Sequence, residues 1–80
     1  TTGSNNVALG HSALGQETTG SFNTAIGHKS LATLNVDGDG NNTAVGYRSG
    51  VAMTTGIQNT IIGSLAGDAL TTGTRNIAIG

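Results

Sequence analysis

The chain contains no cysteine and no proline, and only 9% of its 80 residues are charged. Disordered chains usually carry more charge and more proline, so the composition does not indicate disorder. Three basic residues against four acidic ones give a formal net charge of -1, which provides no basic surface for nucleic acid or an anionic membrane. The absence of cysteine is compatible with a location inside or outside the cell.

Long apolar segments are also missing. No run approaches the roughly 18 residues that a helix needs to span a bilayer. The succession of charged, apolar and small residues that marks a signal peptide is not visible either. The aromatic residues are only Phe22 and Tyr47. We therefore expect no membrane insertion of this segment, and at most one domain.

What the chain does contain is a five-residue phrase, Asn-x-Ala-(Ile/Leu/Val)-Gly, which recurs five times with its closing glycines 17, 19, 17 and 17 residues apart. A fixed period of this kind is typical of solenoids. The sequence predicts one all-β module, a parallel β-roll of about five stacked coils of 17–19 residues. The coils are expected at residues 1–17, 18–37, 38–53, 54–70 and 71–80. Because no capping segment is evident, we interpret residues 1–80 as a fragment of a longer fibre.

Within each phrase the side chains alternate between the two faces of a strand, so that stacking produces two columns. One column is aliphatic and consists of Leu9, Ile26, Val45, Ile62 and Ile79; the other is mostly small and consists of Ala8, Ala25, Ala44, Ile61 and Ala78. We expect the aliphatic column to be the core column inside the coil, because large side chains are needed to fill it. The small column would then let neighbouring chains approach closely. The reverse assignment is the alternative.

Two further positions of the phrase have structural roles. The asparagines are expected to form an amide ladder that hydrogen-bonds from coil to coil, through Asn6, Asn23, Asn42, Asn59 and Asn76. The closing glycines are expected to provide positive φ or a close backbone contact at a corner, at Gly10, Gly27, Gly46, Gly63 and Gly80. Thr-Thr-Gly, which occurs four times, is expected to form the second corner of each coil.

The segment after each closing glycine connects the two corners. Its third residue is always small, at Ala13, Ser30, Ser49 and Ala66, which indicates a crowded position. Further apolar anchors follow at Leu14, Leu31, Leu34, Met53 and Leu70. A short strand and a single helical turn both fit this segment.

The second repeat departs from the pattern, because residues 35–40 replace Thr-Thr-Gly and make the repeat two residues longer. An insertion of this kind predicts an outward loop. Asp37, Asp39 and Asn41 have the spacing that opens a calcium loop, but Asn42 and Arg48 stand where an EF-hand requires Gly and Glu. We favour a solvated turn with no metal and no cofactor. The alternative is a calcium-dependent glycan- or ligand-binding module centred on residues 37–41.

His11, His28 and Tyr47 share another stacked column, which Ser64 continues. Two histidines one coil apart are a candidate metal pair, but a usual site has three or four ligands and no carboxylate shares this column. We therefore expect an exposed polar row. Serine and histidine without a positioned acid do not form a catalytic set, so we expect no enzymatic activity.

The paired threonines suggest one more alternative, an ice-binding solenoid. If Thr54 and Thr55 lie in a strand, they point to opposite sides, and each coil offers one outward hydroxyl instead of two. The second repeat also interrupts the array, because Asn35 and Val36 replace its threonines.

Residues 23–30 and 42–49 resemble the head repeats of YadA-like trimeric autotransporter adhesins, which have an Ala-Ile-Gly-x-x-Ser core, and similar repeats of phage tail fibres. The chain differs in its longer repeat, in Ala13 and Ala66 instead of serine, and in Ile61 instead of alanine. The resemblance implies a left-handed β-roll in which three chains pack about a common axis.

It also implies a non-catalytic structural or adhesive module of an extracellular fibre, acting as a rigid spacer or receptor-binding head. Such a fibre would belong to a virion tail or to a bacterial outer surface. The implied partners are further copies of the chain, as a homotrimer, and a host-cell surface glycan or matrix protein.

Overall fold

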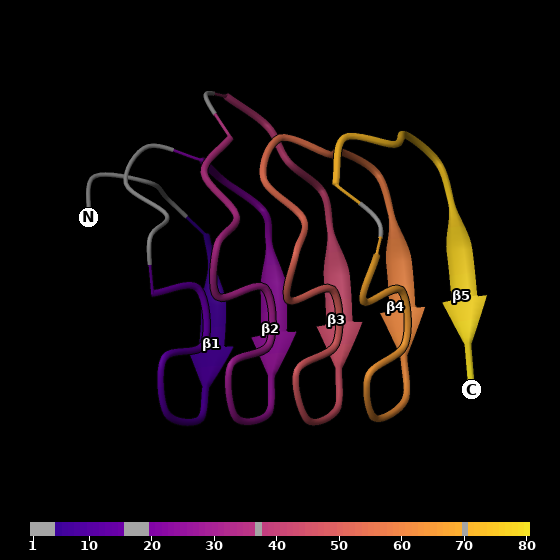
Figure 1. Ribbon diagram of the computed structural model, residues 1–80. Coiled ribbons are helices and arrows are strands. Elements are labelled where there is room, and N and C mark those ends of the chain that lie inside the picture. The colour runs from indigo at the N-terminus through magenta and orange to yellow at the C-terminus, as the bar shows by residue number, and fades with distance from the viewer. Residues whose placement is uncertain (1–4, 16–19, 37, 70) are drawn as a thin grey trace.

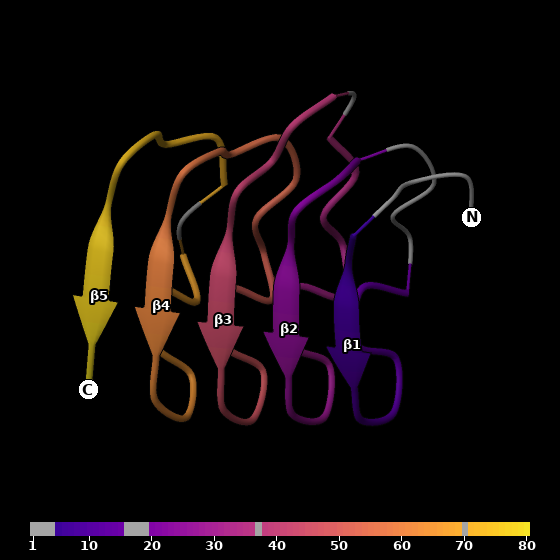
Figure 2. The same ribbon diagram turned by 180° about the vertical axis from the view of Figure 1, so that it is seen from behind.

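The computed structural model describes residues 5–15, 20–36, 38–69 and 71–80. Its five strands are β1 (Val7–Leu9), β2 (Thr24–Ile26), β3 (Thr43–Val45), β4 (Thr60–Ile62) and β5 (Ile77–Ile79). They form one parallel sheet in chain order, with each coil lying on the one before it (Figure 1). Figure 2 shows the same stack from behind. The chain is an all-β parallel β-solenoid of about four turns. The repeat correctly predicted the parallel solenoid, although with about five coils.

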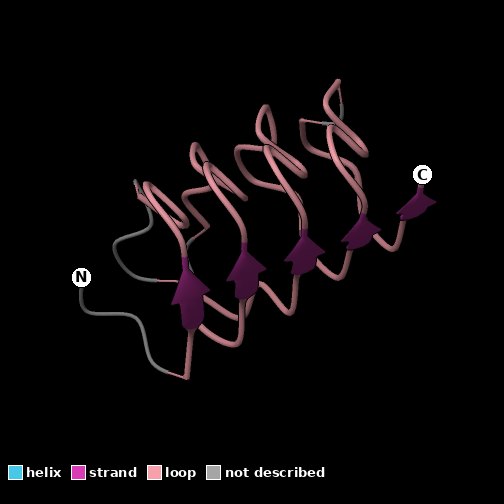
Figure 3. Cartoon of the chain, turned by 90° about the horizontal axis from the view of Figure 1, so that it is seen from below, coloured by secondary structure: helices cyan, strands magenta, loops and turns pink. Residues whose placement is uncertain are grey.

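The strand register follows the sequence repeat. Ala8 pairs with Ala25, Ala25 with Ala44, Ala44 with Ile61, and Ile61 with Ala78. Equivalent residues of successive phrases therefore lie side by side in the sheet. The strands form a single row, and the connecting loops extend furthest on one side of that row (Figure 3).

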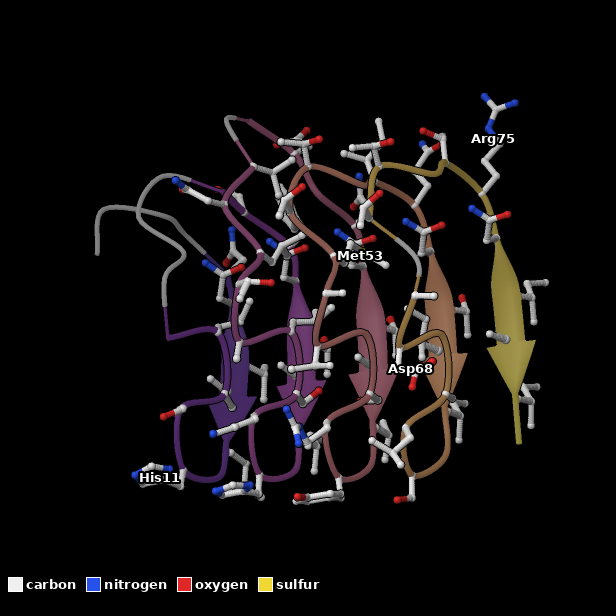
Figure 4. The ribbon with its side chains drawn as sticks, in the orientation of Figure 1. His11, Met53, Asp68 and Arg75 are labelled. Atoms are coloured by element: carbon white, nitrogen blue, oxygen red, sulfur yellow. The ribbon has the colours of Figure 1, made fainter. Side chains whose placement is uncertain are left out.

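The core column was assigned to the wrong face of the sheet. Ala25, Ala44 and Ile61 are fully buried, whereas 65% of Leu9, 40% of Ile62 and 72% of Ile79 is exposed. The large side chains inside the coil come instead from the connecting loops, at Leu14, Leu31, Leu34, Val36 and Met53. These side chains fill the thin interior, so that mostly alanine fits beneath them on the sheet. Met53 lies within the body of the coil (Figure 4).

The segment after each closing glycine is neither a strand nor a helical turn. In the second coil, Lys29 and Leu31 both have positive φ, 60° and 50°. The Ser30 N–H donates to the Gly27 carbonyl and the Ala32 N–H donates to the Lys29 carbonyl, each at 3.2 Å. Successive tight turns of this kind reverse the chain and direct Leu31 inward, where it is fully buried. Leu70, which we expected to be another apolar anchor, lies outside the described residues.

The two corners of the coil need glycine for different reasons. The glycines that close the phrase have φ values between 126° and 139°. A Cβ on Gly46 would also lie 2.7 Å from the backbone of Gly63 in the next coil. Gly56, in Thr-Thr-Gly, has no positive φ, but its Cβ would lie 2.7 Å from the Gly73 carbonyl oxygen. The first corner requires both an unusual conformation and space, whereas the second requires only space.

The insertion leaves the sheet intact. The connection between β2 and β3 rises above its neighbours (Figure 1), yet Thr24 still pairs with Thr43. At the base of the loop the Gly40 N–H donates to the Ser21 carbonyl at 2.9 Å. The part of the chain that the structure describes forms no helix that is long and apolar enough to cross a membrane.

Candidate functional site

The asparagine ladder (Asn6, Asn23, Asn42, Asn59 and Asn76) is the most regular polar feature. At each of its four steps, the backbone N–H of one asparagine donates to the Oδ1 of the asparagine in the preceding coil, at 2.9 to 3.2 Å. Nδ2 of Asn42 also donates to the Gly56 carbonyl, and Nδ2 of Asn59 donates to the Gly73 carbonyl, both at 2.9 Å. These hydrogen bonds therefore connect the starts of β3 and β4 to the next Thr-Thr-Gly corner.

Asn23 is the exception within this ladder. Its Nδ2 is buried and has no hydrogen-bond partner. Asn42 donates to Gly56, which stands three residues before the next ladder asparagine, Asn59. The residue at this position for Asn23 is Asp39, three residues before Asn42, and it belongs to the inserted loop. In the coil with the insertion, no carbonyl accepts this bond. An unsatisfied buried donor costs about 1–3 kcal/mol.

A second polar row lies inside the coil, at the small position after each closing glycine. Ser30 and Ser49 are fully buried, and their hydroxyl oxygens are 2.9 Å apart. The Ser30 hydroxyl donates to the Ala44 carbonyl at 3.1 Å. These serines bind the connecting loop to the sheet, and their burial keeps them away from any substrate in solution.

The column of His11, His28 and Tyr47 is an exposed row of stacked rings. The ring centroids of His11 and His28 are 5.1 Å apart, and those of His28 and Tyr47 are 5.5 Å apart. His11 projects from the edge of the coil (Figure 4). Its Nδ1 lies 3.3 Å from the hydroxyl of Ser12. The described residues contain no group of three or more His, Cys, Asp or Glu side chains placed to hold a metal ion.

The candidate calcium ligands are only partly described. Asp37 lies outside the described residues, and Asp39 and Asn41 are both exposed. Asn41 has a φ of 54°, which it shares with the residue before every other ladder asparagine, such as Gln58 at 58°. Asn41 therefore has the backbone conformation of its position in the repeat.

The threonine pairs differ from what we expected of a strand. Thr54 and Thr55 lie in a bend and are both exposed, as are Thr71 and Thr72. The Thr54 N–H donates to the Thr71 carbonyl at 2.9 Å, which aligns the two bends. Adjacent threonines can therefore both face solvent, because the chain does not alternate here as it would in a strand.

The outer face of the sheet is exposed where the sequence analysis expected the interior of the coil. It carries the aliphatic column (Leu9, Ile26, Val45, Ile62 and Ile79) and, two residues earlier in each phrase, Val7, Thr24, Thr43, Thr60 and Ile77. Val7 is 53% exposed and Ile77 is 76% exposed. The burial of Ala25 and Ala44 on the other face agrees with the reverse assignment that the sequence left open. Choosing that assignment required knowing that the loops fill the interior.

A basic hollow of about 400 Å³ lies among the connecting loops and is lined by Lys29 and Arg48. From the sequence, Lys29 and Arg48 were not predicted to form a binding site. The signal that could have revealed them is their equivalence in the repeat, because each follows its closing glycine by two residues.

Comparisons of the chain with protein-family models, with curated proteins and with solved structures find no match.

Proposed function

We propose that the chain is a non-catalytic structural and adhesive module, a rigid segment of a homotrimeric extracellular fibre. The proposed assembly is a left-handed β-roll in which three parallel chains share a central axis. The fibre would belong to a virion tail or to a bacterial outer surface. The resemblance of residues 23–30 and 42–49 to YadA-like head repeats motivates the handedness, the trimer and the location.

The observation that carries the proposal is the apolar outer face of the sheet. Leu9 on β1, Ile62 on β4 and Ile79 on β5 are exposed, and the side chains of Ile26 and Val45 between them are half-buried. Contiguous exposed apolar surface on a soluble protein is typical of an interaction site. Burying it returns roughly 25 cal/mol for each square ångström removed from water.

A second copy of the same chain suits this face for a geometric reason. The aliphatic side chains recur once per coil, so their spacing is the strand separation of roughly 4.8 Å. An identical chain has the same spacing and the same accumulated twist. Side chains of neighbouring copies can therefore interdigitate along the whole length of the sheet, whereas an unrelated surface would match it only locally.

The same repetition accounts for the proposed mechanical and adhesive roles. Each coil is hydrogen-bonded to the next through the sheet and the asparagine ladder, which gives a stiff segment. Three chains would display every surface feature three times. Weak contacts with a glycan or matrix protein would then add through avidity.

The test is the mass of the chain in solution, measured by sedimentation equilibrium alongside variants of the outer face. The expected mass is three times the 7.8 kDa of one chain. Ile62→Asp should yield a smaller species, because it places several carboxylates at one buried level. Ile62→Thr, which keeps the β-branched shape, should weaken assembly less.

Thr54→Asp provides the control, because Thr54 is exposed and lies in a bend away from the sheet. It adds the same charge and should leave the mass unchanged. A well-folded monomer of the unmodified chain in dilute solution would contradict the proposal, as would equal effects of Ile62→Asp and Thr54→Asp.

A further inference from the structure

The basic hollow is built from one position of the repeat. The backbone N–H of Lys29 donates to the His11 carbonyl, and that of Arg48 donates to the His28 carbonyl, both at 2.8 Å. Both residues have positive φ, 60° and 55°. The side chains of Lys29 and Arg48 therefore start from equivalent backbone positions in adjacent coils. The two positions have the same conformation and equivalent hydrogen bonds.

This arrangement places like charges in register. Side chains at equivalent positions of neighbouring strands or coils are close, and like charges there are destabilising. In the coils on either side the same position holds Ser12 and Leu65, so the repeat does not require a cation. An anion between Lys29 and Arg48 would convert the repulsion into two attractions.

Arg48 has an unused donor. Its Nε is buried and has no hydrogen-bond partner, and its Cζ lies 6.0 Å from the centroid of the Tyr47 ring. An unpaired buried donor is unfavourable. Turning the guanidinium toward the hollow would offer Nε and one terminal nitrogen to two oxygens of a single ligand, the bidentate geometry that arginine forms with oxyanions.

The size and the other walls of the hollow indicate more than a bare ion. A volume of about 400 Å³ lies at the lower end of the range for sites of small organic ligands, about 300–1,000 Å³. The Thr33 hydroxyl is held in place by donating to the Val51 carbonyl at 2.6 Å, so its oxygen can accept a bond from a ligand. Ser12 adds a hydroxyl and Val51 adds an apolar surface. Hydroxyls beside an apolar patch suit a sugar ring.

We propose that this hollow binds a saccharide that carries a sulfate or phosphate ester, with Lys29 and Arg48 holding the oxyanion. Arg48 supplies the bidentate contact and Lys29 supplies a point charge. The hydroxyls of Ser12 and Thr33 contact the sugar. The lining residues come only from the connecting loops of one chain and from no strand of the sheet.

The inference deepens the proposed adhesive function by naming a ligand class, and its biological role rests on that function. The hollow itself does not depend on assembly, because a single chain forms it. The two proposals can therefore fail separately, provided that the mass of the sample is measured under the conditions of the binding experiment.

The experiment is a titration of the 15N-labelled full chain with glucose 6-sulfate and, separately, with glucose 6-phosphate, followed by amide chemical shifts at constant ionic strength. Saturable shifts are expected at Ser12, Lys29 and Arg48, and unmodified glucose should not saturate them. Lys29→Gln and Arg48→Gln should each weaken binding about tenfold, because each removes a charge-assisted contact. Arg48→Lys should weaken it less, because the charge remains.

Arg75→Gln is the matched control. Arg75 is also an arginine with positive φ, but it is exposed and its Nε donates to the Gln58 side chain at 3.0 Å. It projects far from His11, at the opposite end of the stack (Figure 4). The affinity of the Arg75→Gln variant for the sugar esters should stay within about twofold of that of the unmodified chain. Lys29→Gln keeps the test informative if an Arg48 variant does not fold.

Stronger binding of one ester identifies the sulfated or the phosphorylated sugar as the preferred source of the oxyanion. The proposal is overturned if the shifts do not saturate, or if they map to residues outside the hollow. It is also overturned if glucose alone binds equally, or if Arg75→Gln weakens binding as much as Lys29→Gln does.

Discussion

The Cδ1 methyl of Ile61 lies 3.1 Å from the point where a Cβ on Gly50 would stand. The equivalent of Gly50 in the second coil is Leu31, and the strand that follows Leu31 carries Ala44 where the strand that follows Gly50 carries Ile61. At these two levels, the large residue on the following strand therefore accompanies glycine in the loop, and alanine there accompanies leucine. The space beside Gly50 is filled from both walls, because the Cδ2 methyl of Leu31 lies 2.9 Å from the same point.

This relationship predicts energetic coupling between the two positions. Ile61→Ala should lower the free energy of unfolding by about 3 kcal/mol, because it opens a cavity in a close-packed core. Gly50→Ala should also destabilise, since it adds a methyl against Ile61 at a positive φ. In the Ile61→Ala background the same change should cost about 1 kcal/mol less. Urea unfolding of the four chains measures the coupling, and strictly additive effects would contradict the shared space.

Two adjacent asparagines should respond very differently to mutation. Asn42→Ala removes the acceptor for the Asn59 N–H and the donor to the Gly56 carbonyl. The loss should be about 3 kcal/mol, because buried groups on both sides lose partners. Asn41→Gly is the control, because Asn41 is exposed and its φ of 54° suits glycine. Similar midpoints of thermal unfolding for the two variants would show that the ladder does not stabilise the stack.

A pair of glycine substitutions separates strain from overlap. Gly46→Ala combines a φ of 129° with contacts of 2.7 Å to the backbone of Gly63, whereas Gly38→Ala has a φ of 104° and no atom within 4 Å. Strain alone should cost about 1–3 kcal/mol at Gly38. Gly46→Ala should cost more and weaken the contact between its coil and the next. Hydrogen exchange of the β3 and β4 amides reports this local effect, which Gly38→Ala should not produce.

Removal of calcium should leave the chain unchanged. Asp39 is exposed, and the described residues contain no cluster of metal-ligating side chains around it. Asp39→Asn should alter the free energy of unfolding by less than about 0.5 kcal/mol, as surface substitutions usually do. Thermal unfolding with calcium and with a chelator provides the measurement. A clear drop in the unfolding temperature with chelator, abolished by Asp39→Asn, would instead support the calcium-dependent alternative.

The fold could be predicted from sequence because one physical rule dominates it. Residues at one phase of the repeat must lie in one column, and the pairing of Ala25 with Ala44 follows from that rule even across the longer second repeat. The asparagine ladder follows for the same reason. Periodicity determines which residues are neighbours in adjacent coils.

Periodicity does not determine which face of a strand is inside. Ile62 and Ile61 are both aliphatic, and the choice between them depends on how far Leu31 and Met53 reach across the coil. That distance results from turns with positive φ at residues such as Leu31, for which the sequence has no strong signal, because leucine seldom adopts this conformation. The hollow beside Lys29 depends on the same turns and could not be predicted either.

The longer connection between β2 and β3 shows that one corner of the coil tolerates additional residues while Thr24 and Thr43 remain paired. Peptides grafted at the equivalent corners of several coils would be held at fixed intervals set by the strand spacing, roughly 4.8 Å per coil. The scaffold would then act as a molecular ruler, on which the distance between two displayed epitopes is chosen by counting coils.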